Sequence, residues 1–269
     1  ANYPVEFMAA VMNNDINFTD KLSFYKQEIN ELGILLKPPS INKSVEVFSV
    51  DSDKIIYALG ALKNVGIESM KNINEVRDKD GDFKDIFDFA NRVEIRKIGK
   101  RSLEMLIYAG VFDEIYNNRR QLFQSIDILV EYSNLCFSEK NTGQNNLFGD
   151  SNNLLSYPEL KSVDDWSSNE KLKKEYEAIG FYLSAHPLDE YSKWFESKSI
   201  VKLSELNEIL KSGPKLIKIS GSVLNKQERI SNKGNKFAFI QLSDPSGFYE
   251  VTAFSDVLDF YNNLLQPSQ

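Results

Sequence analysis

The spacing of apolar residues along the chain changes near residue 215. Before that point apolar residues recur every three or four positions, which predicts helices in residues 1–40, 59–135 and 167–183. In the first range one apolar stripe ends at Leu32, and Gly33 can follow it in the left-handed conformation that closes helices. In the last range Ser167 and Glu170 have the spacing of a capping box. Residues 41–58 alternate weakly, which predicts short extended pieces around a turn.

From Lys215 apolar and polar residues alternate with a period of two, which is typical of strands. Turns at 232–234 and 244–247 separate three such runs and predict an antiparallel meander. Small barrels of this type need five strands, so we expect the first part of an OB-fold. The predicted fold class is mainly α, with tandem helix–hairpin–helix units, followed by a small antiparallel β unit that forms a partial OB-fold.

The composition is that of a globular protein and favours the cytoplasm. Of 269 residues, 42% are hydrophobic and 26% are charged. No apolar run is long enough to cross a bilayer, and the start does not resemble a signal peptide, so we expect no membrane partner. The single cysteine, Cys136, excludes a disulfide framework and favours a reducing compartment.

The charge limits how nucleic acid can be bound. A net charge of −7 disfavours a protein that contacts phosphates over its whole surface. Two local basic segments remain, at 92–101 and 226–236, and either one can also be an ordinary solvated surface.

Catalytic chemistry has little support in the sequence. One histidine, His186, and one cysteine are too few for a multi-histidine metal site, so no cofactor is expected. His186 precedes a proline and is interpreted as a helix-end residue. Asp51 and Asp53 lack the third carboxylate of a two-metal site.

The first candidate DNA site is the segment Leu59–Gly66, which precedes a predicted helix through Met70 and Ile73. A tight turn between two helices leaves backbone N–H groups free to hold a phosphate without reading sequence. Asn64 occupies a turn position where glycine is usual, and asparagine tolerates a positive φ. The alternative is an ordinary helix turn. A second hairpin is predicted at 107–112, after the basic segment 92–101, and the alternative there is a helical bundle whose turn requires glycine.

Residues 138–165 are predicted to be a polar linker that carries a short apolar motif. Gln144, Leu147 and Phe148 offer an amide and two apolar side chains that can anchor a partner, or can dock on their own domain. In the predicted meander, Phe237 and the basic turn with Lys233 and Lys236 are positioned to stack bases and hold a backbone. The alternative is that Phe237 and Phe239 are core residues, above all Phe239.

Several segments together resemble the C-family replicative polymerases, the alpha subunits of bacterial DNA polymerase III. The resemblance follows the family's order along the whole chain: Ala-Asn-Tyr-Pro-Val-Glu-Phe-Met-Ala-Ala at 1–10, Pro-Pro-Ser-Ile-Asn at 38–42, Gly-Ala-Leu-Lys-Asn-Val-Gly at 60–66, Lys-Arg-Ser-Leu-Glu at 100–104, Gly-Phe-Tyr-Leu-Ser-Ala-His-Pro-Leu at 180–188 and Ser-Asp-Pro-Ser-Gly-Phe-Tyr-Glu-Val at 243–251.

The resemblance implies three regions: the end of a fingers domain at 1–50, a helix–hairpin–helix and clamp-binding domain at 51–200, and the first part of an OB domain at 213–269. It implies a β sliding clamp, DNA and the rest of the polymerase III holoenzyme as partners. It assigns clamp binding to Gln144, Leu147 and Phe148. The DNA-binding residues that we predict are Lys63, Asn64, Val65, Gly66, Ser69, Lys100, Arg101, Lys233, Lys236 and Phe237.

The resemblance also places the palm domain, with its Mg²⁺-binding aspartates, before Ala1. We therefore expect this region to bind DNA and clamp, and so to support grip and processivity in replication, without polymerising DNA itself. Two alternatives remain open. One is a stand-alone DNA-processing enzyme, such as a nuclease or ligase, built from helix–hairpin–helix and OB parts. The other is that the basic segments only hold a larger enzyme together.

Overall fold

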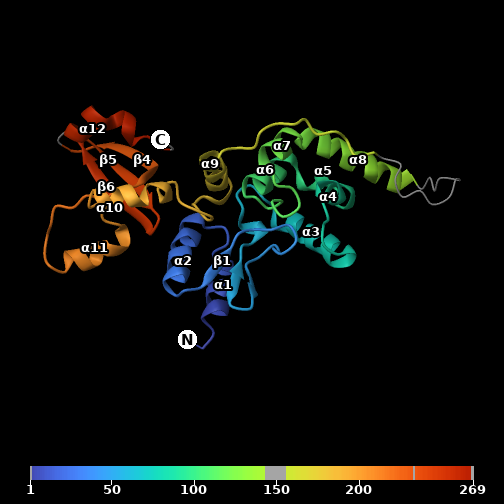
Figure 1. Cartoon of the computed structure of the whole chain (residues 1–269), viewed down its shortest axis with the longest axis horizontal. Helices are drawn as coiled ribbons and strands as arrows, with labels where there is room; N and C mark the ends of the chain where they lie inside the picture. Colours follow the sequence, from blue (N-terminus) through green and yellow to red (C-terminus); the bar gives the residue numbers. More distant parts are fainter. Residues whose placement is uncertain (1, 143–155, 233, 268–269) are drawn as a thin grey trace. The chain divides into compact units, whose positions relative to one another are not determined.

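The computed structural model describes residues 2–142, 156–232 and 234–267, without the side chains of residues 141, 142 and 207. The chain divides into two compact units, Ala1–Leu183 and Ser184–Gln269. Figure 1 shows the chain with most of its helices and strands labelled. The predicted functional boundaries at about residues 50, 200 and 213 stay predictions.

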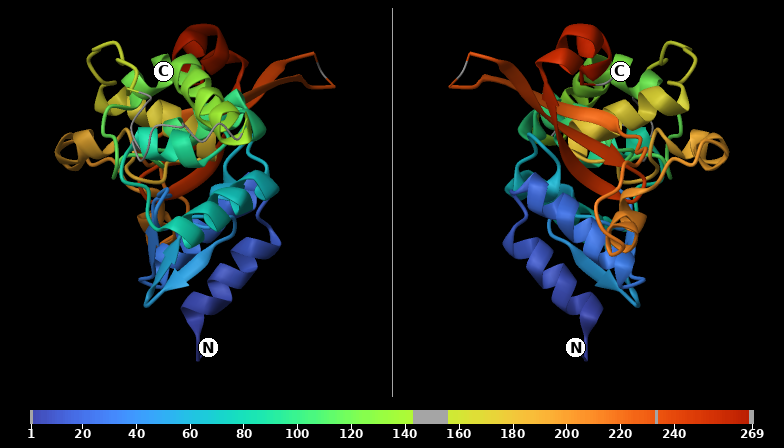
Figure 2. Two further views of the ribbon diagram at one scale, coloured as in Figure 1. Left: turned by 90° about the vertical axis from the view of Figure 1, so that its right-hand side faces the viewer. Right: turned by 90° about the vertical axis from the view of Figure 1, so that its left-hand side faces the viewer.

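The first unit begins with two helices and a small mixed sheet. The helices are α1 (Pro4–Asn14) and α2 (Thr19–Glu31), and Gly33 follows α2 with φ +72°, as predicted. The strands β1 (Leu35–Lys37), β2 (Ser49–Asp51) and β3 (Lys54–Ile56) have the order β1-β3-β2, with β1 parallel and β2 antiparallel to β3. Figure 2 shows α1 and α2 beside this sheet.

The prediction of helices throughout residues 1–40 was wrong at Leu35–Lys37. These three residues extend because their hydrogen-bond partners come from β3, almost twenty residues later. No local pattern of three residues can indicate such a partner.

The rest of the first unit is helical, as predicted, in short segments. They are η1 (Leu59–Ala61), α3 (Ile67–Asp80), α4 (Ile86–Arg92), α5 (Ile95–Ile98), α6 (Lys100–Tyr108), α7 (Arg119–Gln124), α8 (Ile126–Thr142) and α9 (Ser168–Ile179). The rings of Phe83, Phe89 and Phe112 pack edge to face, with neighbouring centroids 5.3 and 5.0 Å apart, and all three are buried. The predicted capping box of Ser167 and Glu170 is present.

The predicted linker 138–165 is shorter than expected. Its first five residues continue α8 to Thr142. Its last residues bind the helical body: Tyr157 stacks on Phe87 of α4 at 4.6 Å, and the Asn118 side chain donates to the Val163 carbonyl at 2.8 Å. The described residues up to Thr142 and from Tyr157 therefore belong to the folded body of the first unit.

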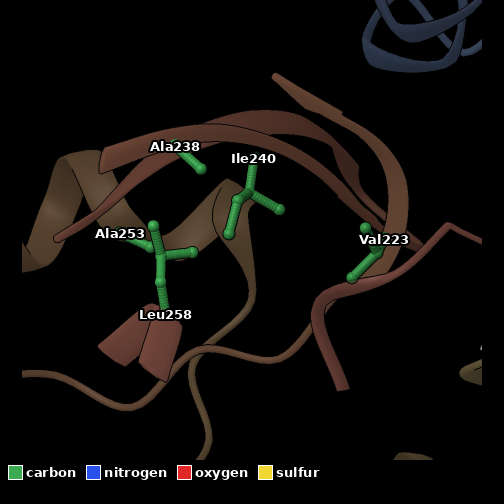
Figure 3. Packing of buried hydrophobic residues seen from close by; sticks show 5 residues of the cluster. All are labelled: Val223, Ala238, Ile240, Ala253 and Leu258. Carbon is green, nitrogen blue, oxygen red and sulfur yellow. The ribbon is translucent and has the colours of Figure 1, made fainter. Parts of the chain in front are cut away.

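The second unit contains an antiparallel sheet with strand order β4-β5-β6, formed by β4 (Ser222–Ile230), β5 (Lys236–Asp244) and β6 (Gly247–Phe254). Its helices are η2 (Asp189–Tyr191), α10 (Ser192–Ser197), α11 (Leu203–Leu210), α12 (Ser255–Tyr261) and η3 (Asn262–Leu265). One face of the sheet packs on α12 through Val223, Ala238, Ile240, Ala253 and Leu258 (Figure 3). This confirms a mainly helical chain that ends in a meander, consistent with a partial OB-like unit.

His186 is not a helix-end residue, which corrects the prediction. Helix α9 ends at Ile179, and His186 is buried in the second unit. The Leu188 N–H donates to its Nδ1, so Nε2 carries the proton and donates to Ser243 Oγ at 3.0 Å. The Leu203 N–H also donates to the Asp244 carboxylate, at 2.7 Å. These contacts tie residues 186–203 to the sheet.

Candidate nucleic-acid interface

The first predicted hairpin forms an exposed turn before α3. Lys63, Asn64 and Gly66 are exposed, and Val65 and Ser69 are partly buried. Asn64 has φ +59°, which confirms that asparagine supplies the left-handed conformation here. Gly66 is the N-cap of α3 and has no side chain to offer the helix. Within the described parts of the chain, no hydrogen bond of normal geometry uses the N–H of Asn64 or Gly66.

The segment before this turn is a single 3-10 turn, η1, and not the α-helix that the hairpin pattern predicts. The reason is competition from non-local partners. The N–H groups of Leu59 and Gly60 donate to the carbonyls of Val45 and Glu46, at 2.9 and 3.0 Å, which stops the helix from extending upstream. Downstream, the Lys63 N–H donates to the Ala178 carbonyl and not to the Leu59 carbonyl, so the turn ends there.

Two other helices, α9 and α6, hold the turn. The Lys63 N–H donates to the Ala178 carbonyl of α9 at 2.8 Å. The Ser102 hydroxyl of α6 donates to the Asn64 carbonyl at 3.1 Å. The turn is thus exposed at its tip and fixed at its base.

The second hairpin lies at α5–Gly99–α6, and the prediction of 107–112 was wrong. Gly110 does end α6 with φ +75°, but the next helix begins only at Arg119. Gly99, with φ +87°, instead joins α5 directly to α6, as a tight hairpin requires. The sequence did not indicate this hairpin because α5 has only four residues, too few for a helical pattern. The one available signal was the spacing of Ile95 and Ile98, which are both buried.

Helix caps set α3 and α6 apart from most of their neighbours. Side chains of Asp85, Asn118 and Ser167 accept N–H groups at the starts of α4, α7 and α9. The first N–H of α5 donates to the Ser133 hydroxyl. Helices α3 and α6 have no side-chain cap. Their first-turn donors and the positive ends of their dipoles are therefore left for an anion.

The cations at the start of α6 are exposed and already paired. Lys100 lies 2.5 Å from Asp127, and Arg101 lies 2.8 Å from Glu104 and 3.5 Å from Glu177. The hydrogen bond to Asp127 raises the pKa of Lys100, and the hydrogen bond to Glu104 raises the pKa of Arg101. Both therefore stay charged at neutral pH, each next to a carboxylate.

The predicted basic segment 92–101 is smaller than its sequence suggests. Arg92 turns inward: its guanidinium donates to the carbonyls of Val76 and Gly81 and lies 4.4 Å from the centre of the Phe83 ring. Arg96, Lys97, Lys100 and Arg101 remain exposed.

The outer face of the second sheet carries aromatic rings. Phe237 and Phe239 are half-buried with centroids 5.4 Å apart, on the face opposite the core residues Ala238 and Ile240. The alternative, in which Phe237 and Phe239 are core residues, is therefore wrong. The Arg229 guanidinium lies 5.2 Å from the Phe239 ring centre, and Lys236, the first residue of β5, is exposed.

Some predicted residues are not part of these surfaces. Lys226, from the second basic segment, has a side chain only 5% exposed, and its ammonium is 2.7 Å from Glu228. Gln144, Leu147, Phe148 and Lys233 lie outside the described residues. No group of three metal-ligating side chains occurs in the described parts of the chain. None of the described helices is long and apolar enough to span a membrane.

The comparisons with known proteins agree with this geometry. Residues 33–122 match a family described as the helix-hairpin-helix motif, a range that contains both hairpins. The DNA polymerase III subunit alpha of Caulobacter vibrioides is 39% identical over 269 residues, and that of Borreliella burgdorferi is 36% identical over 270. The same subunit of Vibrio cholerae is 33% identical over 268. The alignments cover 100%, 98% and 98% of this chain.

The chain is homologous to one region of the bacterial DNA polymerase III alpha subunit. It spans 23% of the length of each of these three relatives. The helix-hairpin-helix match supports DNA binding by this region.

Proposed function

We propose that this chain is the non-catalytic DNA- and clamp-binding region of a replicative polymerase III alpha subunit, where it provides duplex grip and processivity. The observation that carries the proposal is the pair of uncapped helix starts, at Gly66 and Gly99, within the range that matches the helix-hairpin-helix motif. Backbone N–H groups in such turns hold phosphates whatever the base sequence. A replicative enzyme needs such sequence-independent binding, because it must copy every sequence.

The grip on duplex is expected to depend steeply on salt. Each phosphate contact contributes about −0.9 to the slope of log affinity against log salt concentration. Arg101→Ala should therefore weaken binding of a blunt duplex and reduce the slope by about one. The measurement is fluorescence anisotropy at several salt concentrations.

Lys79→Ala is the matched control, because Lys79 is an exposed cation near the opposite end of α3. It should leave both the affinity and the slope unchanged. Duplex affinity that is absent, or that does not respond to salt, would instead favour the alternative in which the basic segments only hold the parent enzyme together.

The same probe with a single-stranded overhang tests the aromatic face. We propose that Phe237 and Lys236 contact single-stranded template, since rings stack on bases and cations hold the backbone. Phe237→Ala should lower affinity for the overhang probe and leave blunt-duplex affinity unchanged. Equal losses on both probes would contradict this role.

Clamp binding is proposed for Gln144, Leu147 and Phe148. The double change Leu147→Ala and Phe148→Ala should weaken binding to the β sliding clamp by at least about 100-fold, because burying each side chain contributes roughly 1.5–3 kcal/mol. Surface plasmon resonance against immobilised clamp measures this loss.

The segment supplies its own control, since Leu154 and Leu155 form a second apolar pair. Changing both to Ala should leave clamp affinity intact. Equal losses for the two pairs would mean that the motif is not the anchor, and no loss for either would place the clamp contact elsewhere.

A further inference from the structure

Ser102 links the two hairpins through one hydrogen bond. It lies in the first turn of α6, its side chain is buried, and its hydroxyl donates to the Asn64 carbonyl at 3.1 Å. The two residues are 38 positions apart. The bond therefore joins the base of the first hairpin turn to the helix start of the second.

The orientation of the Asn64 carbonyl controls the conformation of the turn. Asn64 is in the left-handed conformation, which a non-glycine residue adopts at a cost and keeps only where its surroundings support it. The carbonyl belongs to the planar peptide unit that leads into Val65, so its direction sets the direction of the chain into Gly66 and α3. Loss of the donor would free this peptide to rotate and would leave a partly buried carbonyl unpaired.

We propose that Ser102 is a positioning residue for duplex binding, whose hydroxyl keeps the free amides of the Asn64 turn in register with the start of α6. This inference rests on the proposed grip on DNA. The Ala178 carbonyl of α9 accepts the neighbouring Lys63 N–H, so the turn is fixed at two consecutive residues by two different helices. Through this arrangement both hairpins meet one phosphate backbone together.

The test compares Ser102→Thr with Ser102→Val in the full chain. Thr and Val have nearly the same shape, and only Thr keeps the donor. Blunt-duplex affinity should be about three- to tenfold weaker for Ser102→Val than for Ser102→Thr, as loss of one hydrogen bond predicts. The salt slope should also become shallower for Val, because the two hairpins no longer contact phosphates together. A residue with only a structural role would lower the unfolding midpoint without changing this slope.

Each outcome has a distinct meaning. Equal affinities and equal salt slopes for Thr and Val would overturn the positioning role while leaving the proposed DNA grip intact. A wild-type chain without salt-dependent duplex binding would overturn the proposed function itself. Where Ser102→Val does not fold, Ser102→Ala is compared with the wild-type chain by the same two measurements, with the same outcomes expected.

Discussion

Gly66→Asp should weaken duplex binding by at least about tenfold while slightly raising stability. Gly66 is the N-cap of α3, with φ −81° and ψ 128°, a conformation that aspartate adopts readily at this position. The carboxylate would accept the free N–H groups of α3 and interact favourably with the helix dipole, which contributes about 0.5 kcal/mol over glycine. The same carboxylate would occupy the place of the phosphate and repel it. Anisotropy with a blunt duplex and a urea unfolding curve measure the two effects.

Gly66→Asn separates the two causes. Asparagine caps a helix about as well as aspartate but carries no charge. It should block the amides without repelling DNA, so its affinity should fall between those of the wild-type chain and Gly66→Asp. Unchanged affinity in both variants would show that the start of α3 does not contact DNA.

Gly60→Ala should destabilise the first unit by about 2 kcal/mol or more. A Cβ at residue 60 would lie 2.4 Å from the Glu46 carbonyl oxygen and 2.9 Å from Ile67 Cγ1. The oxygen is backbone and already accepts the Gly60 N–H, so the chain itself must shift, and overpacking of this kind costs roughly 1–3 kcal/mol or more. The midpoint of urea unfolding, followed by circular dichroism, measures the loss.

The matched control is Gly66→Ala, the same substitution six residues later. Its nearest neighbour would be Ser69 Oγ at 3.5 Å, an ordinary contact. A weaker N-cap and a less flexible unfolded chain have opposite effects there, so stability should change by less than about 0.5 kcal/mol. Equal losses in both variants would mean that intrinsic helix preferences, not the close approach to Glu46, set the cost at Gly60.

The features that the sequence predicted correctly depend on neighbours in the chain. The capping box of Ser167 and Glu170 needs only residues three apart. The left-handed Asn64 follows from the tolerance of its own side chain for positive φ. The strands β5 and β6 and the turn between them follow from apolar-rich runs separated by turn residues. The first strand begins at Ser222, seven residues later than the alternation from Lys215 predicted. These are local preferences, and the folded chain keeps them.

The features decided by the tertiary structure depend on partners far away in sequence. Residues 59–61 form a single 3-10 turn because N–H groups at both of its ends donate to distant carbonyls. Leu59 and Gly60 donate to Val45 and Glu46, and Lys63 donates to Ala178. The basic segment loses Arg92 because carbonyls of α3 and of the turn that follows it accept its guanidinium. The contact that joins the two hairpins, from Ser102 to Asn64, spans 38 residues. Such bonds form only when the fold brings donor and acceptor together, so no pattern within a short stretch of sequence can indicate them.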